Sequence, residues 1–249
     1  MAADKSRRVE HGTAAMIHEL RRYTILPGAM PEYLRLIADV GGPIRGDRYG
    51  RLLGFWITAF GGGNEVFHLW EHDDLDTRQR LRDELFALKP WADLVREIAP
   101  RVGEQEVRLM TACTPFVPPR AGGHAYELRF VRSRMGAAGP LAAAVASELA
   151  VQAPAAGRLV GVWNTLAGDP NEAVCLIAHE DVAARLRQGA CGSEATLSPS
   201  KLPSSACLRL RDRESIPPLS DAVNKMALMG GVRGQGAGTS APPCGPSPG

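Results

Sequence analysis

The sequence predicts an α+β fold made of two tandem ferredoxin-like units, each with the order β-α-β-β-α-β, packed sheet to sheet. The main observation is a phrase that occurs twice: LLGFWITAFGGGNEVFHLWEH at Leu52 to His72, and a fainter copy, LVGVWNTLAGDPNEAVCLIAHE, at Leu159 to Glu180. The same order of elements can be read around each copy. The chain of 249 residues is also long enough for two units of roughly 100 residues each.

The two copies align at one constant spacing. The matched positions are Gly54 with Gly161, Trp56 with Trp163, Asn64 and Glu65 with Asn171 and Glu172, and His72 with His179. Upstream, HELR at His18 to Arg21 matches YELR at Tyr126 to Arg129, with one residue more between the copies. A single gap in a loop explains that difference.

In the first unit, alternating residues predict a strand over Met16 to Thr24, which Pro27 and Gly28 end. Pro31 opens a helix with apolar residues at helical spacing, and Gly41-Gly42 is expected to stop it. A hairpin follows, with strands at Leu52 to Phe60 and Glu65 to Glu71. Asp74, Asp76 or Thr77 can cap the next helix, whose apolar stripe runs over Leu81 to Leu88, and a second stripe runs over Trp91 to Ile98. A fourth strand is predicted at Glu104 to Thr111.

The second unit repeats this order in a degraded form. Its predicted elements are a strand at Ala125 to Val131, an Ala-rich helix through Leu141 and Leu149, a hairpin at Arg158 to Ala178, a short helix at Asp181 to Arg187 and a strand at Ala206 to Arg211. A ferredoxin-like unit leaves one sheet face bare. Two units that pack bare face to bare face are therefore expected to enclose a sheet-lined cavity.

The ends of the chain differ in composition from these units. Residues 1–15 lack the apolar core of a signal peptide, and residues 221–249 are rich in Gly, Pro and Ser, so both segments are predicted to be disordered. The predicted organisation is a leader (1–15), a first domain (16–116), a second, degenerate domain (124–220) and a tail (221–249).

Composition excludes several classes of protein. The chain carries 29 Lys and Arg against 27 Asp and Glu, and its basic residues do not cluster, so a nucleic-acid partner is not expected. The five cysteines are odd in number and show no Cys-x-x-Cys spacing, which argues against a disulfide framework and a thiolate zinc site. No apolar run approaches the roughly 20 residues of a membrane span. A cytoplasmic protein in a reducing compartment is expected.

The segments HELRRYTILPG, LLGFWITAFGGGNEVFHLWEH and LVGVWNT resemble the NIPSNAP family, strongly in the first unit and weakly in the second. The resemblance implies tandem domains of the dimeric αβ-barrel superfamily, and homodimers or pseudo-dimers. It implies no reaction, because the family as a whole has no established enzymatic activity. Animal members associate with mitochondria, so mitochondrial association is a further expectation from the resemblance.

Polar residues on the first strand are the first candidate ligand contacts. Glu19, Arg21 and Tyr23 share one face and would lie inside the barrel if Leu20 faces the helices. Arg21 could then clamp a carboxylate or phosphate. The structural alternative, which we favour, is an ion pair of Arg21 with Glu19 or with the matching residues of the second unit.

His68, Trp70 and His72 share one face of the third strand. His68 is the candidate catalytic acid or base, with Trp70 as an aromatic wall, whereas a hydrogen-bonded interior histidine is the favoured alternative. His68 and His72 lie roughly 13 Å apart on a strand, which is too far for shared metal coordination. Position 175 is Cys and position 177 is Ile in the second copy, so this chemistry is confined to the first unit.

Three further residues complete the candidate ligand site. Trp56 is either a core anchor or a second aromatic wall. Arg45 and Tyr49 lie in RGDRYGR, which either attracts anions at a cavity mouth or forms a solvated loop. No metal or cofactor motif is present.

Two functions remain open from the sequence. The first is a non-catalytic binding or interaction module whose barrel cavity is filled mainly by its own side chains, with a small-molecule ligand, a protein partner or a second copy as its possible partner. The second is a cofactor-independent enzyme of the dimeric αβ-barrel superfamily, with acid/base chemistry or monooxygenation in that cavity. The second rests on analogy between folds.

Overall fold

The computed structural model describes residues 16–60, 63–119, 124–187 and 204–210. By its contacts the chain divides into Met1–Ile216 and Pro217–Gly249, and the second unit lies wholly outside the described residues. The predicted leader and tail also lie outside them. No described helix is long and apolar enough to cross a bilayer.

The first half has the predicted order of elements. They are β1 (Ile17–Ile25), α1 (Met30–Leu36), a π-helical segment (Ile37–Gly41), α2 (Gly42–Arg45), β2 (Arg51–Phe60), β3 (Glu65–His72), α3 (Leu75–Ala87), α4 (Lys89–Ile98), a 3-10 turn (Ala99–Arg101) and β4 (Val102–Ala112). Asp74 caps α3 by accepting a hydrogen bond from the Thr77 amide at 2.6 Å, as predicted.

The expected stop at Gly41-Gly42 is wrong. Helical backbone continues through both glycines as the π segment and α2, and ends at Gly46, whose φ is 49°. Pro43 does not break the helix because it lies in the first turn of α2, where its missing N–H is tolerated. This extra turn carries Arg45 toward the sheet.

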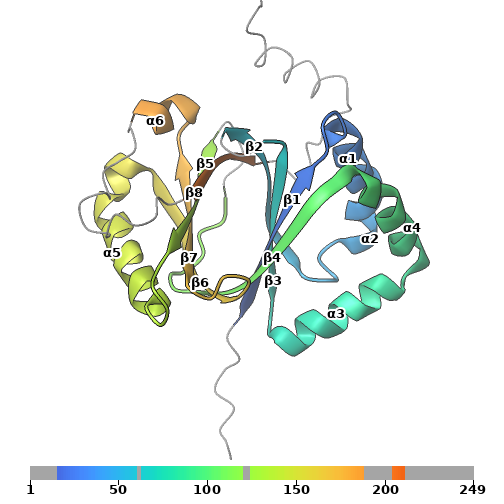
Figure 1. Cartoon of the computed structure of the whole chain (residues 1–249), viewed down its shortest axis with the longest axis horizontal. Helices are drawn as coiled ribbons and strands as arrows, with labels where there is room; N and C mark the ends of the chain where they lie inside the picture. The colour runs from blue at the N-terminus through green and yellow to red at the C-terminus, as the bar shows by residue number, and fades with distance from the viewer. Residues whose placement is uncertain (1–15, 61–62, 120–123, 188–203, 211–249) are drawn as a thin grey trace, which may run out of the picture. The chain divides into compact units, whose positions relative to one another are not determined.

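The second half repeats the pattern with fewer helices. Its elements are β5 (Ala125–Arg132), α5 (Ala138–Ala156), β6 (Arg158–Ala167), β7 (Glu172–His179), α6 (Val182–Arg187) and β8 (Ser204–Leu210). Within Met1–Ile216, α1 to α4 cover the strands of the first half, and α5 and α6 cover those of the second (Figure 1).

The eight described strands close into one barrel in the order β1-β3-β2-β8-β5-β7-β6-β4. The two halves meet at two antiparallel seams, β2 with β8 and β4 with β6. The two predicted sheets are therefore joined edge to edge, in addition to facing one another.

Apolar side chains from both halves fill the inside of this barrel. They include Leu20, Phe67, Leu69, Met110, Leu128 and Leu176, and the void left among them is only about 10 Å³. The expectation of a sheet-lined cavity is therefore wrong. Leu20 faces the barrel interior, and the alternation of strand side chains then places Glu19, Arg21 and Tyr23 on the helix-covered face.

The repeated Gly-x-Trp motif has a packing role. A Cβ atom at Gly54 would lie 2.2 Å from Cη2 of Trp56, and one at Gly161 would lie 2.6 Å from Cη2 of Trp163. Each indole lies across its own glycine, so no larger residue fits there. Trp56 is 1% exposed in the barrel core, which confirms the core anchor and contradicts its assignment as a ligand wall.

Candidate functional site

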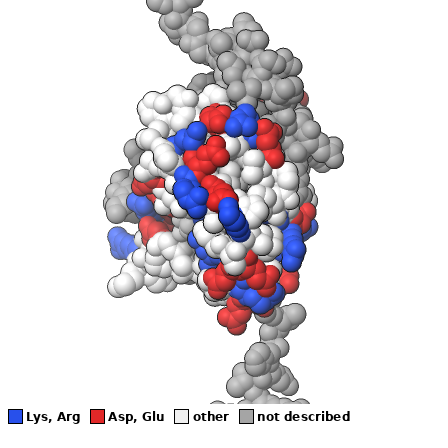
Figure 2. Space-filling view, turned by 90° about the vertical axis from the view of Figure 1, so that its right-hand side faces the viewer, with Lys and Arg blue, Asp and Glu red and all other residues white. Residues whose placement is uncertain are grey.

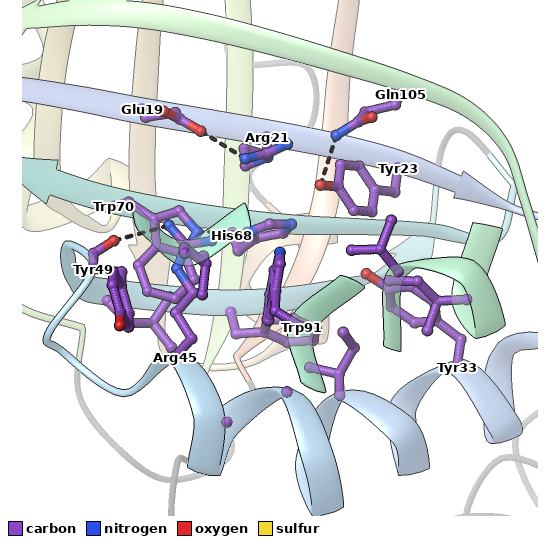
Figure 3. Close-up of a pocket in the computed structure, with 18 of the residues that line it drawn as sticks. Glu19, Arg21, Tyr23, Tyr33, Arg45, Tyr49, His68, Trp70, Trp91 and Gln105 are labelled. Carbon is purple, nitrogen blue, oxygen red and sulfur yellow. Dashed lines mark hydrogen bonds and ion pairs between the residues drawn. The ribbon is translucent and has the colours of Figure 1, made fainter. Parts of the chain in front are cut away.

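A cavity of about 1050 Å³ lies between the strands of the first half and the helices that cover them. The sheet contributes residues of β1, β2, β3 and β4, and the helical layer contributes residues of α1 to α4 (Figure 3). Apolar side chains make up much of its wall: Tyr33, Leu34, Ile37, Phe55, Trp91, Val95 and Ile98. Ligand pockets typically combine such walls with a few polar groups.

Seven of the eight residues that the sequence singles out line this cavity. They are Glu19, Arg21, Tyr23, Arg45, Tyr49, His68 and Trp70. The eighth, Trp56, lies on the opposite side of the sheet. The sequence thus predicts most of the set but assigns it to the wrong face of the sheet.

Glu19 holds two arginines on the β1 side of the cavity. Its Oε1 accepts a hydrogen bond from Nη1 of Arg21 at 3.0 Å, and its Oε2 accepts one from Nε of Arg78, on α3, at 2.6 Å. This confirms the predicted pair of Arg21 with Glu19. Burial raises the pKa of Glu19, but the charges of Arg21 and Arg78 and the Arg78 hydrogen bond outweigh it, so the pKa is lowered.

The second half contains a matching carboxylate-arginine network, to which a histidine is added. Glu127 accepts hydrogen bonds from Arg129 at 3.0 Å and Arg185 at 2.7 Å, and its Oε2 lies 3.2 Å from Nε2 of His179. These residues occupy the repeat positions of Glu19, Arg21, Arg78 and His72. A network present in both copies stabilises the packing of helix on sheet, whatever each half binds.

His68 and Trp70 are found in the first half alone. Nε1 of Trp70 donates a hydrogen bond to Nδ1 of His68 at 2.6 Å, which assigns the imidazole proton to Nε2. Nε2 is buried and has no partner. Burial, with the charges of Arg21 and Arg45, lowers the pKa of His68 well below 6.5. His68 is therefore a neutral imidazole that offers one N–H donor.

Arg45 is a buried cation stacked on an aromatic ring. It is 9% exposed, and its Cζ lies 3.4 Å from the centre of the Trp70 ring. Its Nη2 donates to the carbonyl of Tyr49 at 3.3 Å, and its Nε has no partner. In the described part of the chain, no carboxylate lies within ion-pair distance of Arg45. Burial and the charge of Arg21 lower the pKa of Arg45 to about 9.

The structure thus rejects the solvated-loop alternative for Arg45 and Tyr49, because Tyr49 is only 3% exposed. His72 also lines the cavity, and neither of its ring nitrogens has a partner. The described residues contain no cluster of three or more His, Cys, Asp or Glu side chains that could hold a metal ion.

Sequence reasoning missed the helical wall of the site. Trp91 is predicted as part of an apolar stripe, which is correct, but it also lines the cavity, as do Arg78 and Arg82 of α3. The sequence signal that could have revealed this wall is the difference between the two copies of the repeat. At the same interface the second half has small apolar residues that pack together: Val131, Ala142, Val145, Val162, Cys175 and Ile177.

The fold of this chain, two ferredoxin-like halves closed into one barrel, is shared by solved structures of distant sequence. A putative monooxygenase from Fusobacterium nucleatum aligns with 81% of the chain and 94% of its own length at a TM-score of 0.58 and 10% identity. An anthrone oxidase-like protein aligns with 80% of the chain and 92% of its own at a TM-score of 0.57 and 7% identity. At such identities the likeness concerns the fold alone.

The chain belongs to the NIPSNAP family. The NIPSNAP family model matches residues 18–118. Human NipSnap homolog 3A is 30% identical over 68% of this chain and 70% of its own length. Human NipSnap homolog 3B is 32% identical, and the match spans 55% of this chain and 57% of that protein. A NIPSNAP family protein of unknown function from Agrobacterium tumefaciens is 30% identical over 42% of this chain and 96% of its own, with a TM-score of 0.40.

Proposed function

We propose that this NIPSNAP protein is a non-catalytic ligand-binding module, and that its site is the cavity between the first-half strands and α1 to α4. The observation that carries the proposal is a cavity of about 1050 Å³ in which arginines and an apolar wall lie together. Ligand pockets typically combine an apolar wall with a few polar groups that orient the ligand.

The difference between the halves supports the same proposal. Both halves keep the carboxylate-arginine network, so this network does not require a cavity. The first half adds His68, Trp70 and Arg45, whereas the second has Cys175 and Ile177 at the positions of His68 and Trp70. The side chains that differ are those around the cavity, as expected if one copy binds a ligand.

The state of His68 favours binding over catalysis. A general base at neutral pH needs a free lone pair and a pKa near the working pH. Nδ1 of His68 accepts a hydrogen bond from Trp70, and burial holds its pKa well below 6.5. These properties weigh against the cofactor-independent enzyme.

Native mass spectrometry after incubation with a cell extract tests the proposal. The wild type is expected to retain a small molecule, whereas Ala38→Trp, which adds an indole on the cavity wall, is expected to lose it. Ala87→Trp is the control, because Ala87 is exposed at the end of α3 and does not line the cavity. Equal retention by Ala38→Trp and the wild type would contradict the proposed site.

We also infer a reducing location such as the cytoplasm, with mitochondrial association as the alternative that the family suggests. The inference is supported by Cys113 and Cys175, which are both free thiols. Pairing with a second copy or another protein is part of the same proposal. Met135 is 91% exposed and offers an apolar contact for it.

A further inference from the structure

We propose that the occupant of the cavity is an amphipathic organic acid, with one carboxylate on an apolar chain or ring. This inference rests on the proposed ligand-binding function and names the ligand class. Two properties of the cavity carry it: its positive charge and its apolar wall.

The charge of the cavity is positive. Four arginines line it, Arg21, Arg45, Arg78 and Arg82, against two carboxylates, Glu19 and the exposed Glu104. Both oxygens of Glu19 are taken by Arg21 and Arg78. Arg45 and Arg82 contact aromatic rings instead, with Cζ of Arg82 4.7 Å from the centre of the Phe86 ring. A buried cation without a counter-charge is costly, and an anion would balance it.

The outer surface over the same helices differs from the cavity. Figure 2 shows basic and acidic side chains interspersed on that face. Arg35 pairs with Glu32 at 2.8 Å, and Arg80 with Glu84 at 2.8 Å. The unbalanced positive charge therefore belongs to the cavity, so it acts on a ligand inside.

The one buried carboxylate of the cavity wall, Glu19, is already paired with Arg21 and Arg78, which leaves Arg45 without a negative partner in the described part of the chain. The complementary group of a ligand is therefore negative, which describes a carboxylate and excludes an amine.

The apolar wall of the cavity indicates that the rest of the ligand is apolar. Tyr33, Leu34, Phe55, Val95 and Ile98 line the same cavity, and the Phe55 ring stacks on the His68 imidazole with the ring centres 5.8 Å apart. A volume of about 1050 Å³ is at the upper end of ordinary ligand pockets. A small inorganic anion would leave this wall without contacts, whereas an acyl chain or aromatic ring would cover it.

Isothermal titration calorimetry with three probes tests the inference: octanoic acid, octanamide and inorganic phosphate. The acid is expected to bind at least tenfold more tightly than the amide, and phosphate is expected not to bind measurably. Arg45→Met is expected to lose at least tenfold in acid affinity without a change for the amide. Arg45→Lys, which keeps the charge, is expected to lose less. Arg96→Met is the control, because Arg96 is exposed on α4 and pairs with Asp93.

The outcomes separate this inference from the proposed function. Equal affinities for the acid and the amide would show that the ligand does not need a carboxylate, while the cavity would still be a binding site. If phosphate binds as tightly as the acid, the ligand does not need an apolar chain or ring. If none of the probes binds while the wild type still retains a molecule that Ala38→Trp loses, the ligand class is wrong and the binding function stands. If no molecule is retained either, both fail.

Discussion

Arg45 is a buried cation that costs stability, and the proposed ligand would offset this cost. Its guanidinium is buried on the Trp70 ring and has no carboxylate partner among the described residues. Replacing buried charged groups by apolar residues of similar volume is often neutral or stabilising, by about 1–4 kcal/mol. Arg21 has the opposite situation, because it pairs with Glu19.

We therefore expect Arg45→Met to leave the free energy of unfolding unchanged or to raise it by about 1–4 kcal/mol in the absence of ligand. Arg21→Met is expected to lower it by about 3–5 kcal/mol, because the variant breaks a buried pair. Urea unfolding at pH 7 measures both. A marked loss of stability in Arg45→Met would show that Arg45 is a structural residue.

At the scale of elements, the π segment Ile37–Gly41 sets the distance between the helices over the cavity. A Cβ atom at Gly41 would lie 3.2 Å from Cδ2 of Leu94 on α4, so this glycine allows the two helices to pack closely. The same segment lets the helix continue to Arg45. Helix spacing and the position of the cation are thus coupled through one short stretch.

Gly41→Leu is expected to destabilise the protein by about 1–3 kcal/mol through overpacking against α4. Leu94→Ala removes the obstructing side chain and is expected to be destabilising alone, by about 2–5 kcal/mol. The double variant is expected to lose less stability than the sum of the two single losses, because Leu94→Ala makes room for the larger side chain at position 41. Thermal unfolding of the four proteins measures this coupling, and additive losses would contradict the proposed contact.

The network around Glu127 joins β5, β7 and α6, and it predicts that the stability of the protein depends on pH. Burial raises the pKa of Glu127, but hydrogen bonds from His179, Arg129 and Arg185 outweigh it and hold the pKa well below 4.5. A carboxyl whose folded pKa is lowered stabilises the protein above its unfolded pKa, and this contribution is lost as the pH falls toward the folded value.

Glu127→Gln is therefore expected to cost about 3–5 kcal/mol at pH 7, and the difference from the wild type is expected to shrink as the pH falls below 4.5. Urea unfolding between neutral and acidic pH measures this difference. Glu84→Gln, at an exposed pair on α3, is the control and is expected to show little change at any pH. A difference that stays constant with pH would mean that the carboxylate charge is not the cause.

At the scale of the whole barrel, the two halves share one interior. The core contains residues of both, and Nε1 of Trp163 donates a hydrogen bond to Nδ1 of His18 at 2.8 Å, across 145 positions of the sequence. The seams β2-β8 and β4-β6 add backbone hydrogen bonds between the halves. We therefore expect each half to lose its core when the other unfolds.

We expect one cooperative unfolding transition for the barrel, despite its origin in a repeat. Tryptophan fluorescence and far-ultraviolet circular dichroism are expected to give coincident urea transitions. Trp163→Phe is expected to lower the urea midpoints of the two signals by the same amount, because it removes the hydrogen-bond donor to His18. Two separate transitions would show that the halves are independent domains.

Much of this molecule could be predicted from its sequence, because the repeat fixed the order of elements and period-two alternation identified which residues share a face. Alternation does not say which face is inside. Both faces of β1 carry polar residues, His18 and Arg22 on one and Glu19 and Arg21 on the other, so the wrong side was assigned to the cavity. Gly41-Gly42 is a typical helix stop, and only the packing on Leu94 explains why the helix continues.

The position of β8 has a consequence for how the protein is made. β8 (Ser204–Leu210) lies between β2 and β5 and is the last described strand to leave the ribosome. Until it emerges, one edge of each of these two strands lacks its partner, and unpaired edges invite association with other chains. During translation the edges of β2 and β5 therefore stay unpaired until β8 emerges, and association with other chains is favoured in this interval.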